Sequence, residues 1–79
     1  MSDTVLIWYN SFLEKEPSLE DLENEIAEVT GAISNNRLWL LGSKTSQEQQ
    51  SHESNICDLE EYLEVLNQMK YHLEKPANF

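Results

Sequence analysis

Apolar residues recur with a helical period near the start of the chain. The spacing i, i+3, i+4, i+7 predicts a short helix over residues 4–13, capped by Asp3 or Thr4, and its apolar positions are Val5, Trp8, Tyr9 and Phe12. The first five apolar residues also have the composition of a β-strand. Because no second strand is evident to pair with them, we predict a helix, followed by a link that Pro17 closes.

The strongest periodic pattern covers residues 18–41. Ser18 and Asp21 have the spacing of a capping box at the start of a helix, and Gly42 stands where a glycine ends one. Between them the a and d positions of three heptads are filled by Leu19, Leu22, Ile26, Val29, Ile33, Asn36 and Leu40. A buried Asn36 could fix helix register, or its side chain could turn toward water.

The middle of this segment has weak helix formers. Val29, Thr30 and Gly31 together cost roughly 1 kcal/mol or more relative to alanine-like residues, so a break near residues 31–36 is an alternative. We predict one continuous helix because the apolar period passes through the weak stretch without a change of phase.

Residues 43–54 are polar throughout, and we expect a connecting loop or a frayed start of the next helix. A second long helix is predicted over residues 55–75, capped by Asn55 and ended by Pro76, with residues 76–79 as a tail. Its main apolar seam consists of Ile56, Leu59, Leu63, Leu66 and Leu73, and an adjoining row consists of Tyr62, Val65 and Met69.

Two amphipathic helices joined by a polar stretch favour an antiparallel hairpin. We therefore predict one all-α domain over residues 1–79, in which a short N-terminal helix precedes a coiled-coil-like helical hairpin. A core in so short a chain supplies only about 3–5 kcal/mol of net stability, which favours added stabilisation from a protein partner.

The charge narrows the range of partners. Fifteen acidic and five basic residues give a formal net charge of −10, which disfavours binding to nucleic acid or to an anionic membrane. The first residues lack the basic region of a signal peptide, and no apolar run approaches the length of a membrane span. We expect a cytoplasmic protein.

Candidate chemistry is sparse. Cys57 is the only cysteine, and its spacing from His52 and His72 matches no metal site, so we expect neither a metal nor a cofactor. The carboxylates occupy ordinary helix positions, and the two glycines form no phosphate-binding loop. We therefore expect a protein that is not an enzyme.

The apolar residues exceed what the mutual seam of two helices can bury. Either the N-terminal helix covers the surplus, or a helical partner or a second copy of the chain does. The densest exposed-looking cluster surrounds Trp39, which we expect to be a contact point. The candidate partner-binding residues are Trp8, Phe12, Ile33, Trp39, Leu40, Tyr62, Leu66, Met69 and Leu73.

The order of these elements resembles that of the small co-chaperones of type III secretion needle subunits. The resemblance rests on the short apolar helix Val5–Leu13, the proline-terminated link and the hairpin Ser18–Leu41 with Asn55–Lys75. It implies a cytoplasmic hairpin that pairs with a helical-repeat chaperone to hold an aggregation-prone needle subunit. The polar connector at 43–54 is longer than the tight turn of that family.

Three functions are consistent with these patterns. The first is an escort or assembly module that binds helical partners through apolar stripes. The second is an acidic inhibitor that mimics nucleic acid and occupies a basic groove, because seven acids and one lysine fall within residues 14–28. The third is a structural coiled-coil subunit that self-associates.

Overall fold

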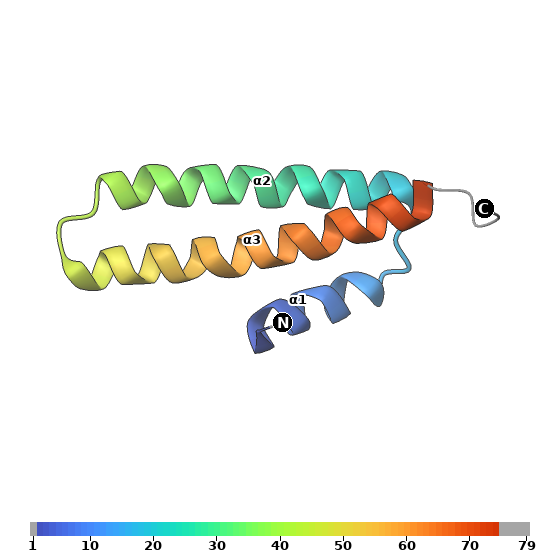
Figure 1. Ribbon diagram of the computed structural model, residues 1–79, viewed down its shortest axis with the longest axis horizontal. Coiled ribbons are helices and arrows are strands. Elements are labelled where there is room, and N and C mark those ends of the chain that lie inside the picture. Colours follow the sequence, from blue (N-terminus) through green and yellow to red (C-terminus); the bar gives the residue numbers. More distant parts are fainter. Residues whose placement is uncertain (1, 75–79) are drawn as a thin grey trace.

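The computed structural model describes residues 2–74, which form three α-helices. Helix α1 spans Asp3–Leu13, α2 spans Leu19–Leu41 and α3 spans Ser46–Glu74. The long helices α2 and α3 pack against each other as a hairpin, and α1 packs on α3 rather than on α2 (Figure 1). The predicted all-α fold, a short helix followed by a helical hairpin, is confirmed.

Helix α1 is capped one residue earlier than predicted. The cap is Ser2, whose hydroxyl accepts a hydrogen bond from the Val5 amide at 3.2 Å. The Ser2 amide in turn donates to Oε1 of Glu61 on α3 at 2.7 Å. The amino end of a helix carries partial positive charge, so a carboxylate from α3 stabilises it there and also ties α1 to the hairpin.

Helix α2 runs without a break through the weak stretch around Gly31, so the prediction of one continuous helix is confirmed. Its capping box is complete. The Asp21 amide donates to Oγ of Ser18 at 3.2 Å, and the Ser18 amide donates to Oδ2 of Asp21 at 3.0 Å. Gly42 caps the carboxyl end with φ −90°, so this cap does not use the left-handed conformation that only glycine adopts easily.

Helix α3 begins at Ser46, well before the predicted start at Asn55. Of the two alternatives for residues 43–54, a loop or the start of the next helix, the structure has the start of the helix from Ser46 onward, and the loop is confined to residues 42–45. The Glu48 amide donates to Oγ1 of Thr45 at 3.1 Å, and the Lys44 amide donates to Oε2 of Glu48 at 3.1 Å. These bonds cap a helix start that lacks apolar residues. The predicted end at Lys75 and the tail at 76–79 lie outside the described residues.

The core lies along the seam of the hairpin and continues under α1. Its buried apolar residues are Val5, Phe12, Leu22, Val29, Ile33, Tyr62 and Leu66. Asn36 is also buried in the seam rather than turned toward water. Its Nδ2 donates to the Ala32 carbonyl of its own helix at 2.8 Å. The buried amide therefore satisfies its donor within α2.

The capping box yields a direct test of how α2 is stabilised. We expect Ser18→Ala to lower the free energy of unfolding by about 1 kcal/mol, because the Asp21 amide loses its acceptor. Ser11→Ala is the matched control, since Ser11 is exposed in the last turn of α1 and alanine is the better helix former. Urea unfolding followed by circular dichroism measures both. Equal stability of the two variants would contradict the assignment.

Candidate protein-binding surface

Large apolar side chains are exposed at several places on the molecule. They are Leu6, Ile7, Leu13, Leu19, Leu38, Trp39, Leu41, Tyr71 and Leu73. Single exposed apolar residues are common on protein surfaces, whereas neighbouring ones form patches of the kind that proteins use to bind partners. The exposed residues at 38, 39 and 41 are such neighbours.

These neighbours, with the half-buried Leu40, occupy the last turn of α2, and we call them the tip cluster. Leu38, Trp39 and Leu41 are 66%, 57% and 84% exposed. The turn is closed by Gly42, whose amide donates to the Leu38 and Trp39 carbonyls. The backbone beneath the cluster therefore keeps its helical hydrogen bonds to the end of α2.

Helix α1 does not reach the tip cluster. It lies beside the carboxyl-terminal half of α3, whereas the tip cluster is at the opposite end of the hairpin, next to the turn (Figure 1). On the α3 side the Trp39 ring meets the imidazole of His52, with 5.9 Å between ring centroids. Within residues 2–74 this end of the hairpin therefore has two layers where the other end has three.

All three helices meet at Tyr62. The ring of Trp8 from α1 lies 5.7 Å from the Tyr62 ring between centroids, tilted by 55°. The Tyr62 hydroxyl donates to Oε2 of Glu25 on α2 at 2.7 Å. Burial raises the pKa of this phenol well above its ordinary value, and the hydrogen bond to Glu25 and the negative charge of Glu25 raise it further.

The structure separates the nine predicted partner-binding residues into three groups. Phe12, Ile33, Tyr62 and Leu66 are buried in the core, where the chain itself covers them. Trp8, Leu40 and Met69 are half-buried. Trp39 and Leu73 are exposed. Only the last five offer surface to another molecule in this fold, and whether they contact a partner stays a prediction.

Several exposed apolar residues were absent from the predicted set. Leu6 and Ile7 on α1 lie between the periodic positions that pack on α3, and Leu38 and Leu41 lie off the seam of α2. These four residues could have been found in the sequence, because each is apolar at a position where the helical period predicts a polar residue. That signal identifies an outward-facing residue once the seam has been assigned.

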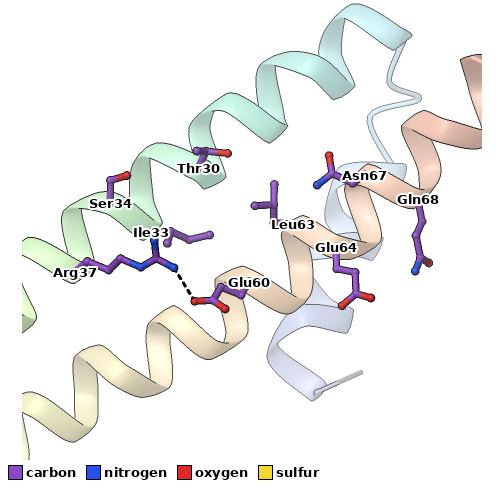
Figure 2. A pocket seen from close by; sticks show the side chains of 9 residues that line it. All are labelled: Thr30, Ile33, Ser34, Arg37, Glu60, Leu63, Glu64, Asn67 and Gln68. Atoms are coloured by element: carbon purple, nitrogen blue, oxygen red, sulfur yellow. Dashed lines mark hydrogen bonds and ion pairs between the residues drawn. The ribbon is translucent and has the colours of Figure 1, made fainter.

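A shallow groove of about 650 Å³ runs between α2 and α3 (Figure 2). Its apolar residues are Ile33 and Leu63, and the others are Thr30, Ser34, Arg37, Glu60, Glu64, Asn67 and Gln68. Nη2 of Arg37 pairs with Oε1 of Glu60 across it at 3.2 Å. Both side chains are largely exposed, so the pair contributes little stability. Seven of the nine lining residues are polar or charged.

A second hollow, of about 320 Å³, lies between α1 and the carboxyl-terminal part of α3. It is lined by Tyr9, Val65, Gln68, Met69, His72 and Leu73. This site brings together Met69 and Leu73 from the predicted set.

No reactive constellation was found in residues 2–74. That part of the chain contains no group of three or more histidine, cysteine or acidic side chains arranged to hold a metal ion. Cys57 is a free, exposed thiol. Among the same residues, no helix is both long enough and apolar enough to cross a membrane.

Comparison with known proteins adds no assignment. No protein-family model, no curated protein and no solved structure matched the chain.

The Tyr62 contact predicts a specific loss of stability at alkaline pH. The fold favours the protonated phenol, so its contribution is complete below the ordinary pKa of 10.0 and is lost as the pH rises above that value. In Tyr62→Phe we expect the free energy of unfolding to fall less steeply above pH 10.0, by up to about 1.4 kcal/mol per pH unit.

Tyr71→Phe is the control, because Tyr71 is exposed. The contrast between the two variants isolates the contact of Tyr62 with Trp8 and Glu25. Urea unfolding at a series of pH values measures the slopes. If the two variants show the same slope, the protonated Tyr62 does not stabilise the fold.

Proposed function

We propose that this protein is a non-catalytic, cytoplasmic protein-binding module that escorts or assembles helical partners. The observation that carries the proposal is the tip cluster, where Leu38, Trp39 and Leu41 are exposed side by side in the last turn of α2. Exposing several large apolar side chains costs solvation free energy, and a partner that covers them recovers it.

Helix α1 indicates what kind of partner fits. It is a short amphipathic helix that packs on the hairpin through Val5, Trp8 and Phe12 and leaves its other face to solvent. An amphipathic helix of a partner could lie on the uncovered end in the same manner, with Trp39 against its apolar face. In this respect α1 acts as an internal example of the interaction that we propose.

The arrangement of the elements supports an escort role in particular. A short helix ahead of a helical hairpin resembles the co-chaperones of type III secretion needle subunits, which hold an aggregation-prone helical protein. That family resemblance is part of the proposal. The short turn at residues 42–45 replaces the long predicted connector, which removes the departure from the family's tight hairpin turn.

The proposal is tested by capture with tagged protein from the source cell, followed by reconstitution with the purified partner. We expect Trp39→Ala to fold as the unmodified protein does, because the side chain is exposed, and to bind the partner on the order of tenfold more weakly or worse. Tyr71→Ala, which removes an exposed aromatic side chain near the far end of α3, should bind normally.

Mixing with the partner should also raise the melting temperature and the helical circular dichroism signal, since a ligand of the folded state stabilises it. Two results would count against the proposal. One is equal binding by the Trp39 and Tyr71 variants. The other is a partner that binds without raising the melting temperature.

A further inference from the structure

A second surface lies on the side of α2 that faces away from α3. Seven residues spaced alternately by four and three positions follow this side, and we call them the outer stripe: Glu20, Asn24, Ala27, Gly31, Ser34, Leu38 and Leu41. All seven are exposed. Because α1 packs on α3, α2 forms an outer edge of the molecule (Figure 1). Of the stripe, Ser34 borders the groove with α3 and Asn24 borders a hollow beside Phe12.

The outer stripe has large side chains at one end and small ones in its middle. Leu38 and Leu41 are 66% and 84% exposed. Ala27, Gly31 and Ser34 form a shallow middle section, and a Cβ atom added at Gly31 would meet nothing within 4 Å. Trp39 is not part of this surface, since its ring packs toward His52 on α3. When two helices pack, a leucine of one helix fits against a small residue of the other. The outer stripe contains both leucines and small residues.

Charge is distributed unevenly along the same helix. Residues 19–28 contain five acidic residues and no basic one, namely Glu20, Asp21, Glu23, Glu25 and Glu28. Residues 29–45 contain Arg37 and Lys44 and no acidic residue. Two parallel copies of α2 would bring the acidic halves together, whereas two antiparallel copies would place each acidic half beside the basic one.

We propose that the outer stripe is a self-association surface on which a second copy of this chain packs with its α2 antiparallel to the first. The stripe alternates steps of four and three residues. In two antiparallel copies, a residue reached by a four-residue step on one helix lies beside a residue reached by a three-residue step on the other. When Ser34 lies beside Gly31 of the second copy, Leu38 lies beside Ala27 and Leu41 beside Asn24. Large side chains then meet small or short ones along the whole contact.

The same register places the carboxyl end of α2, which is followed by Lys44, near the acidic start of α2 in the second copy, where Glu20 lies on the stripe. A two-fold axis near residues 31–34 repeats each of these contacts, so the assembly closes at a dimer. The interface uses neither the α2–α3 seam nor Trp39. This inference therefore goes beyond the proposed escort function. Because the stripe shares Leu38 and Leu41 with the tip cluster, a dimer would compete with a partner that covers those two leucines.

Analytical ultracentrifugation of the full chain over a wide concentration range tests the proposal. We expect a reversible monomer–dimer equilibrium. The double variant Leu38→Glu with Leu41→Glu should remain monomeric, and so should Gly31→Lys, which places a charged side chain in the middle of the stripe. Lysine is a better helix former than glycine, so Gly31→Lys should not unfold the monomer. Trp39→Ala is the matched control and should dimerise normally.

Cysteine cross-linking tests the direction of packing. In a Cys57→Ser background, Ser34→Cys places a thiol near the two-fold axis and should form an intermolecular disulfide. Leu41→Cys places the two thiols about 25 Å apart along the helices and should not. A parallel dimer would cross-link at both positions, and that outcome would overturn the antiparallel arrangement.

A protein that stays monomeric at every concentration overturns the proposal, and so does a dimer that survives the stripe variants or is lost in Trp39→Ala. Partner capture that depends on Trp39 in a strictly monomeric protein would leave the escort function standing and reject only the dimer. Self-association through the stripe without any captured partner would support the dimer and reject the escort function.

Discussion

The fold depends on the burial of one phenol. Tyr62 is only 3% exposed, and a buried hydroxyl without a partner is costly. Glu25 of α2 accepts its hydrogen bond and Trp8 of α1 packs against its ring. One side chain of α3 therefore fixes the register of the hairpin and receives the N-terminal helix. The exposed ion pair between Arg37 and Glu60 depends on that register but contributes little to it.

Helix α1 covers many of the apolar side chains that the seam of the two long helices does not bury. Residues 2–74 contain six of the seven tyrosine, tryptophan and phenylalanine side chains, and four of these six are at least half-buried where α1 meets the hairpin: Trp8, Tyr9, Phe12 and Tyr62. Of the two explanations left open by the sequence, packing of the N-terminal helix accounts for these residues. It does not account for Trp39 and Tyr71, which lie near opposite ends of the hairpin and stay exposed.

The helices were predicted correctly where the apolar residues recur with a clear helical period, and incorrectly where they do not. Residues 19–41 have that period and a capping box, and both were predicted correctly. The first turns of α3 have neither an apolar stripe nor a strong propensity, so the pattern failed there, although Thr45 and Glu48 already had the capping-box spacing. The binding residues were predicted less well. Periodicity identifies an apolar face such as that of Phe12 and Leu66 but not what covers it.

The incomplete packing of the seam near the turn is explained by the composition of α3 rather than by that of α2. Residues 46–55 of α3 carry no aliphatic or aromatic side chain except the imidazole of His52. The last turns of α2 therefore face a polar helix. The cost is visible in the seam itself, where Oδ1 of Asn36 and Nδ1 of His52 are buried without a hydrogen-bond partner among residues 2–74. The hairpin is thus well packed where α1 joins it and incompletely packed at its turn. A partner would gain most by covering the incompletely packed end.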